Sequence, residues 1–198
     1  MNGQAGAGPR GQGGGDKASR PDRRGLVLLH TGAGKGKTTA ALGLAMRAAG
    51  HGMRVLLRQF IKGGWTPGEA KALARFDDCI DHRAVGRGFV RPKALAPEAL
   101  ARERTAAAEA FAAASAEAKA SDADLVIFDE ALYLVDFGLL DEARILAFLA
   151  ERPPQRHVVL TGRGATPALI EAADLVTEMT CIKHPYDAGI PAQPGIEF

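Results

Sequence analysis

Cysteine and long apolar runs are both scarce in this chain of 198 residues. The two cysteines, Cys79 and Cys181, stand far apart and form no CxxC pair, which argues against a disulfide framework and against a cysteine-rich zinc site. No apolar run approaches the ~20 residues that cross a bilayer, and the N-terminus has no apolar stretch typical of a secretory signal. These absences predict a cytoplasmic protein with no membrane partner, and we expect Cys181 to be a buried, small apolar side chain.

Charge of one sign is also scarce, since the net charge is only +2. The excess lies in residues 1–24, where five basic residues face two acidic ones for a net +3, so the remainder carries −1. A near-neutral body argues against nucleic acid as a partner. Residues 1–24 also hold seven glycines in their first fifteen positions and show no apolar period, so we expect a disordered, Gly-rich basic tail there and one domain over 25–198.

Short apolar runs alternate with helical segments through residues 25–198. The clearest helix is at 97–120, because Pro97 suits a first turn and alanine dominates the rest of the segment. Alternation of this kind, with strands that are apolar on both faces, predicts an α/β fold in which a mostly parallel central sheet is layered between helices. We expect strands at 26–30, 53–61, 79–85, 125–128, 157–160 and 175–182, and further helices at 38–49, 69–76, 141–149 (capped by Asp141) and 167–173.

The strongest chemical signal is the glycine-rich segment 31–39, which lies between a predicted strand and a predicted helix. Its glycines let backbone N–H groups converge on a phosphate, and the helix N-terminus adds partial positive charge. Lys37 supplies an ammonium group, and the Thr38 hydroxyl is a Mg²⁺ ligand in loops of this type. Counted from Gly32, the loop is one residue short of the usual spacing, which favours chemistry other than transfer of a terminal phosphoryl group. The predicted nucleotide-binding residues are Gly32, Ala33, Gly34, Lys35, Gly36, Lys37, Thr38 and Thr39.

Other candidate residues lie on the same predicted rim of the sheet, at strand ends and loops, where ligands bind in such folds. Asp129 and Glu130 end an apolar strand, where an acidic partner of Mg²⁺ is expected, although such a pair can also cap a turn. Arg163, in a glycine-flanked turn, is placed to reach phosphate, with a plain surface arginine as the alternative. Trp65 and Phe89 are loop aromatics that either join the core or face a large, flat ligand.

Together these segments resemble one family, the P-loop corrinoid adenosyltransferases, which act on cob(I)yrinic acid a,c-diamide. The resemblance spans 25–198 and implies a three-layer P-loop NTPase-like fold. It also implies transfer of the 5′-deoxyadenosyl group of ATP to the reduced cobalt, Co(I), of a corrinoid, with release of triphosphate, in adenosylcobalamin biosynthesis or salvage. The matching segments are 31–39, 59–63, Trp65, 68–69, 88–89, 128–130, 161–164 and 183–198.

The resemblance also implies roles for individual residues and partners. Lys37 would neutralise the triphosphate, and Phe89 would cover the lower face of the cobalt, so both are predicted catalytic residues. Thr38 with Glu130, or with Asp129, would hold Mg²⁺. The family further implies a cytoplasmic homodimer that works with an electron-donating flavoprotein reductase.

The chain departs from the family pattern at Ala33, where asparagine is usual, and at Arg91, where the family has a tryptophan. Two other functions remain open on the residues alone. One is a P-loop phosphotransferase or ATPase, and the other is a non-catalytic chaperone that binds ATP and corrinoid. The three are separated by their products, which are triphosphate, ADP or neither.

Overall fold

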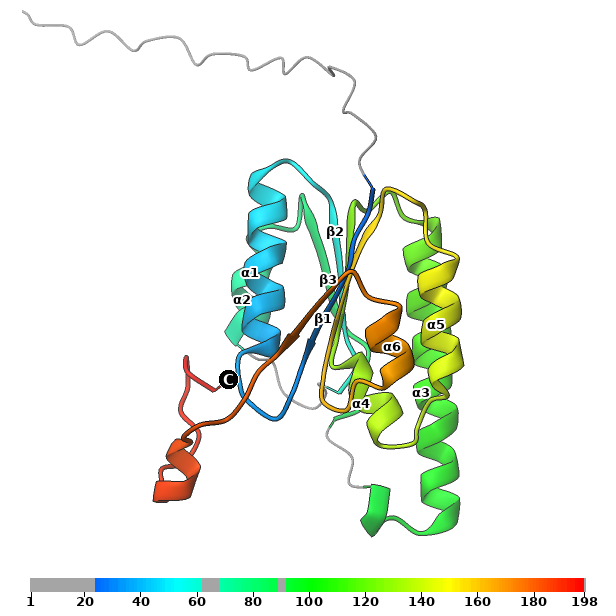
Figure 1. The fold of residues 1–198 in the computed structure, drawn as a ribbon. Coiled ribbons are helices and arrows are strands. Elements are labelled where there is room, and N and C mark those ends of the chain that lie inside the picture. The colour runs from blue at the N-terminus through cyan, green and yellow to red at the C-terminus, as the bar shows by residue number, and fades with distance from the viewer. Residues whose placement is uncertain (1–23, 62–67, 89–91, 198) are drawn as a thin grey trace, which may run out of the picture.

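The fold is a parallel sheet between two layers of helices, seen in a computed structural model that describes residues 24–61, 68–88 and 92–197 (Figure 1). The strand order is β3-β2-β4-β5-β1-β6, and each pairing in this described sheet is parallel. The predicted α/β fold with a central parallel sheet is confirmed. The strands are β1 (Val27–Thr31), β2 (Val55–Gln59), β3 (Ile80–Ala84), β4 (Leu125–Asp129), β5 (His157–Thr161) and β6 (Leu175–Glu178).

Helices α1 and α2 cover one face of the sheet, and α3 to α6 cover the other (Figure 1). Within the described ranges, no helix combines the length and the apolar character that crossing a membrane requires. The helices are α1 (Lys37–Gly50), α2 (Gly68–Leu73), α3 (Pro97–Ala120), α4 (Ala131–Asp136), α5 (Glu142–Ala150) and α6 (Pro167–Glu171), with single 3₁₀ turns at Pro92–Ala94 and Pro185–Ala188.

The core has a different character on each face of the sheet. Under α3 and α5 it is aromatic: the rings of Phe128 and Phe148 stack with centroids 4.8 Å apart, and Phe111 meets Phe128 edge-on at 5.8 Å. On the other face, α1 contributes small side chains to the core, since Ala41 and Ala45 are fully buried against the aliphatic residues of the strands. These alanines let α1 pack closely on the sheet, which fixes the start of that helix at the rim.

Most predicted elements lie within a few residues of their observed bounds. The helix predicted at 97–120 is observed at those bounds, and Asp141 caps α5 as expected, since its carboxylate accepts a hydrogen bond from the backbone N–H of Ala143 at 3.0 Å. Helix α4 was not predicted. The predicted tail, 1–24, lies outside the described residues except for Arg24, which forms an ion pair with Asp174.

Two predictions at the C-terminal edge of the sheet are wrong. The strand expected at 175–182 ends at Glu178, and all four of its residues are exposed because β6 is an edge strand. Cys181 was expected to be buried but is exposed, since the chain has left the sheet by that point. Helix α6, which precedes β6 in the chain, ends at Glu171 rather than at the expected residue 173.

Candidate active site

The glycine-rich loop between β1 and α1 is held against the chain that follows β6. The backbone N–H of Gly34 donates to the carbonyl of Met179 at 2.6 Å. A Cβ atom added to Gly34 would lie 2.7 Å from that oxygen, and one added to Gly32 would lie 2.5 Å from it. Gly32 and Gly36 also have φ of 95° and 105°, a region that side chains disfavour. The loop therefore has its shape because these positions are glycine.

Lys37, the first residue of α1, places its ammonium group inside this loop. Its Nζ donates to the carbonyl oxygens of Gly32 at 2.8 Å and Gly34 at 2.5 Å, and the residue is 9% exposed. Burial is the main cause that lowers the pKa of Lys37; nearby Arg163 lowers it further, and the neighbouring carboxylates oppose both. The loop thus concentrates cationic charge at the carboxyl ends of the strands, as the sequence predicts for a phosphate site.

Asp129, at the end of β4, is the most heavily bonded side chain of the site. It is 1% exposed, and its carboxylate accepts hydrogen bonds from the Thr161 hydroxyl at 2.6 Å, the Gln59 amide at 3.0 Å and the Thr38 hydroxyl at 3.0 Å. The Thr38 proton points at the carboxylate, so the oxygen lone pairs of Thr38 are left for a ligand. This arrangement joins the glycine-rich loop 31–39, called the phosphate loop from here on for the role that its sequence predicts, to the acidic strand end.

Glu130 has an unusual backbone conformation. Among the residues that the structure describes, it is the one non-glycine residue with positive φ, at 63°. Its N–H donates to the Thr161 hydroxyl at 2.8 Å, and it forms the N-terminal boundary of α4. A left-handed residue of this type costs about 1–3 kcal/mol and persists where its surroundings determine it. The surroundings therefore hold the Glu130 backbone in this conformation. In it, the Glu130 carboxylate is close enough to Lys37 to raise the pKa of that ammonium.

The residues present fit a magnesium ion. Mg²⁺ takes few protein ligands, prefers oxygen and keeps several waters. Thr38 offers an oriented hydroxyl oxygen and Glu130 a nearby carboxylate. In the described ranges, no three histidine, cysteine, aspartate or glutamate side chains gather into a metal cage. A site of this composition suits an ion that also binds phosphate oxygens.

Arg163 lies on the same rim, in the loop after β5, and is exposed. Its charge acts on both Lys37 and Tyr133, a half-buried residue of α4. Burial raises the pKa of Tyr133, and Arg163 opposes that rise. The loop packs closely against α4, since a Cβ atom added to Gly162 would lie 2.8 Å from the Leu132 side chain. The structure thus brings Arg163 to the same edge of the sheet as the phosphate loop.

The remaining predicted residues either are exposed or lie outside the described residues. Ala33 and Thr39 are exposed, and the Lys35 ammonium forms an ion pair with Glu197 near the C-terminus. Trp65 and Phe89 lie outside the described residues.

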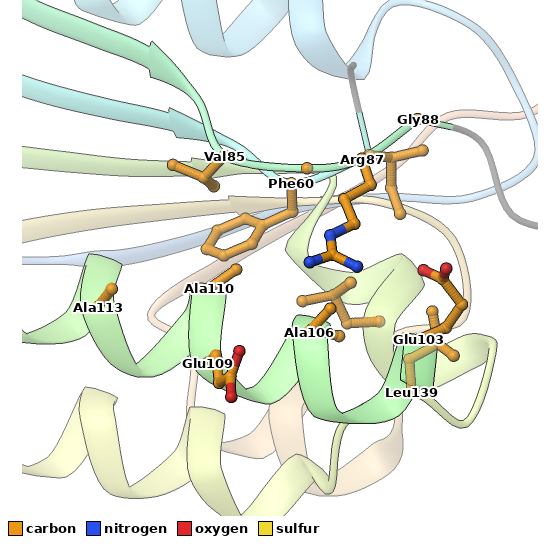
Figure 2. A pocket seen from close by; sticks show the side chains of 14 residues that line it. Phe60, Val85, Arg87, Gly88, Glu103, Ala106, Glu109, Ala110, Ala113 and Leu139 are labelled. Carbon is orange, nitrogen blue, oxygen red and sulfur yellow. The ribbon is translucent and has the colours of Figure 1, made fainter. Parts of the chain in front are cut away.

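A cavity of about 330 Å³ lies between the loop after β3 and helix α3 (Figure 2). Its walls are mainly apolar, and the Arg87 side chain extends from the β3 side toward α3. A Cβ atom at Gly86 would lie 1.7 Å from the carbonyl oxygen of Phe60, so the loop runs directly over the end of β2. Gly88, on its wall, directly precedes Phe89. The cavity was not predicted, although the alanines of α3 that line it give room for it.

Sequence reasoning also assigned no role to Gln59, Thr161 or His82. The first two lie in segments that match the family, and each is the polar last residue of a strand that is largely apolar. A polar residue at the carboxyl end of a buried strand is the sequence signal that could have identified Gln59 and Thr161 as site residues.

Comparisons with known proteins identify the family of the chain. A family model described as ATP:corrinoid adenosyltransferase BtuR/CobO/CobP matches residues 23–198. A corrinoid adenosyltransferase of Pseudomonas aeruginosa is 44% identical over 183 residues, covering 91% of this chain and 87% of the relative. One of Escherichia coli K12 is 39% identical over 183 residues, covering 91% of this chain and 89% of the relative.

Among solved structures, one match is domain III of the replication initiation protein DnaA of Thermotoga maritima, which is 13% identical. The match covers 80% of this chain and 56% of that chain, with a TM-score of 0.38. A likeness so slight carries no argument. The family model spans nearly all of the chain, and the relatives match over most of their own length. The chain therefore belongs to the ATP:corrinoid adenosyltransferase family.

Proposed function

We propose that this chain transfers the 5′-deoxyadenosyl group of ATP to the Co(I) centre of a corrinoid. An electron pair of cobalt forms the Co–C5′ bond as the C5′–O bond breaks, and that bond's electrons leave with the triphosphate. The observation that carries the proposal is the phosphate loop: a buried Lys37 ammonium and a Thr38 hydroxyl bonded to Asp129 meet at the rim of a chain of this family.

The phosphate loop holds the leaving group. A triphosphate carries most of the negative charge in ATP, and the Lys37 ammonium and the Arg163 guanidinium are close enough to share one electrostatic field. Charge-assisted hydrogen bonds to an anion are about twice as strong as neutral ones. Cations fixed in advance at this place favour departure of the triphosphate, because they stabilise charge that moves onto the leaving oxygen.

Thr38 and Glu130 are proposed to hold Mg²⁺, with Asp129 as the residue that orients Thr38. When bound, the ion would offset part of the triphosphate charge. Asp129 already accepts three side-chain hydrogen bonds, so its oxygens are largely committed within the protein. The Glu130 carboxylate is close enough to Lys37 to raise the pKa of that ammonium, which supports a role for Glu130 beside the loop that would hold the phosphates.

The corrinoid is proposed to meet Phe89 on the lower face of its cobalt. An apolar ring there excludes water or a base from the axial position, which makes Co(II) easier to reduce. The support for this role is the match of Gly88 and Phe89 to the family pattern, and Phe89 itself lies outside the described residues.

We further propose a homodimer in the cytoplasm that receives electrons from a flavoprotein reductase. Exposed apolar side chains in the segment after β6 support a protein partner there. Ile182 is 96% exposed, Ile196 is 81% exposed and Tyr186 is 77% exposed. Residues 1–23 are proposed to be a tail outside the domain, since Arg24 already pairs with Asp174.

The test is anaerobic incubation of the protein with ATP, Mg²⁺ and chemically reduced cobalamin, followed by absorption spectroscopy and nucleotide analysis. We expect the adenosylated corrinoid spectrum and one triphosphate for each corrinoid converted. ADP as the product would support a phosphotransferase or ATPase instead. Binding of both ligands with neither product would support the chaperone.

A further inference from the structure

A chain of hydrogen-bonded side chains runs from the edge of the sheet to the phosphate loop. His82, on edge strand β3, places its Nε2 2.8 Å from the Oε1 atom of Gln59 on β2. The Nε2 atom of Gln59 lies 3.0 Å from Oδ2 of Asp129 on β4. The Thr38 hydroxyl, in the first turn of α1, donates to the same carboxylate. Three neighbouring strands and one helix are thus linked in a single line.

The direction of each hydrogen bond in this line is fixed by chemistry. An ionised carboxylate only accepts, so Gln59 must turn its NH₂ group toward Asp129. The carbonyl oxygen of Gln59 then faces His82, and the ring nitrogen at 2.8 Å must carry a proton and donate it. If Gln59 were reversed, two acceptors would oppose each other at 3.0 Å. The structure therefore requires His82 to be protonated on Nε2.

Burial makes this line sensitive to the loss of one member. Gln59 is 0% exposed and Asp129 is 1% exposed, so neither can replace a lost partner with bulk water. A buried acceptor without a partner costs about 1–3 kcal/mol. Without the proton of His82, the Gln59 carbonyl oxygen loses its donor, and the amide can tilt about its contacts to Asp129 at 3.0 Å and Glu69 at 3.5 Å, which weakens its hydrogen bond to Asp129. The orientation of the Thr38 hydroxyl depends on that carboxylate.

We propose that His82 is a positioning residue for the Thr38 hydroxyl, acting through Gln59 and Asp129, and that it thereby sets how much Mg²⁺ strengthens the binding of ATP. The inference rests on the proposed function in one respect, the assignment of Thr38 to Mg²⁺. His82 lies on edge strand β3, two strands away from Asp129 on β4, and is proposed to act through this line. Its effect is carried by the orientation of one hydroxyl at the other end of the line.

The test compares ATP affinity with Mg²⁺ and with EDTA by calorimetry. His82→Phe keeps a ring of similar size but removes the donor, and we expect it to weaken Mg·ATP binding about 5- to 10-fold, the equivalent of one net hydrogen bond, while metal-free ATP binding changes less than about 2-fold. His82→Gln places an amide N–H the same number of bonds from Cα as the histidine Nε2 atom, and it should restore most of the lost Mg·ATP affinity. His51→Phe, at an exposed histidine beyond α1, is the matched control and should have no effect.

A second measurement is independent of metal and nucleotide. The ring ¹⁵N shifts of His82 in the wild-type protein should show Nε2 protonated and Nδ1 unprotonated when the ring is neutral. The opposite tautomer would overturn the inference, and so would an unchanged Mg²⁺ effect in His82→Phe when the wild type shows one. If wild-type ATP affinity does not respond to Mg²⁺ at all, the proposed metal role fails, and this inference fails with it.

Discussion

The hydroxyl of Thr38 in α1 donates to the carboxylate of Asp129 at the end of β4 over 3.0 Å. The two residues are 91 positions apart in the chain. Their contact joins the phosphate loop to the acidic strand end and gives one orientation to the hydroxyl that is proposed to bind Mg²⁺.

Thr38→Val tests this contact, because valine has nearly the same shape and lacks the hydroxyl. We predict that ATP binding by the variant loses most of its dependence on Mg²⁺, a loss of about 10-fold or more in the presence of the ion, since a hydrogen bond and a metal ligand disappear together. Titration calorimetry with and without Mg²⁺ measures it. Thr105→Val changes an exposed threonine of α3, on the other face of the sheet from α1, and should bind like the wild type; equal losses in both variants would show a general effect of replacing threonine with valine.

Lys37→Ala should abolish adenosyl transfer and weaken ATP binding about 10- to 100-fold, because a charge-assisted contact of about 1.5–3 kcal/mol is removed from the triphosphate. Binding and turnover assays measure the two effects. Lys35→Ala removes the exposed lysine of the same loop, which is paired with Glu197, and should have a much smaller effect. Near-normal turnover by Lys37→Ala would mean that the loop does not hold the triphosphate.

Gly34→Ala should lower both the melting temperature and the affinity for ATP. Its Cβ atom would lie 2.7 Å from the Met179 carbonyl oxygen, so the loop would have to move away from the chain after β6. Gly43→Ala, inside α1, meets no atom within 4 Å and should stabilise the protein by about 0.5–1 kcal/mol through helix propensity. Thermal denaturation of both variants checks the contrast, and a Gly34→Ala protein as stable as the wild type would contradict the described packing of the loop.

Phe89→Ala should slow the reaction that starts from Co(II) far more than the reaction that starts from chemically prepared Co(I). The aromatic ring is proposed to assist reduction, a step that the second assay bypasses. Arg91→Trp, which restores the family pattern, should speed the Co(II) reaction. Equal losses in both assays for Phe89→Ala would instead indicate poor binding or misfolding.

Deletion of residues 1–23 should leave the melting temperature nearly unchanged, because that segment is predicted to contribute nothing to the core. Arg24 is kept because it forms an ion pair with Asp174. Differential scanning calorimetry compares the two proteins, and a large drop in the melting temperature would show that the segment packs on the domain.

Local sequence signals predicted much of the fold. Helix α3 was located at its observed bounds because Pro97 marks its first turn and alanine, the best helix former, fills most of its later turns. The phosphate loop was located from its glycines and from the apolar strand before it. Helix α4 was missed because six residues give less than two turns of apolar periodicity.

Features that depend on which strands are neighbours could not be predicted. The exposure of β6 follows from its position at the edge of the sheet, and Cys181 is exposed because it lies beyond the end of that strand. The apolar pattern of a strand does not show whether the strand is central. The Gln59–Asp129 contact requires those two residues to be register partners on adjacent strands. A polar residue at a strand end is visible in the sequence, but its partner is not.

The central claim is that the C5′–O bond of ATP breaks and its carbon is transferred to cobalt. The most direct measurement follows ATP labelled with ¹³C at C5′ during anaerobic turnover with Co(I) corrinoid, using ¹³C and ³¹P NMR. We predict that the labelled carbon becomes bonded to cobalt while intact triphosphate accumulates in equal amount. A label that stays in ADP, with inorganic or transferred phosphate as the other product, would contradict the account.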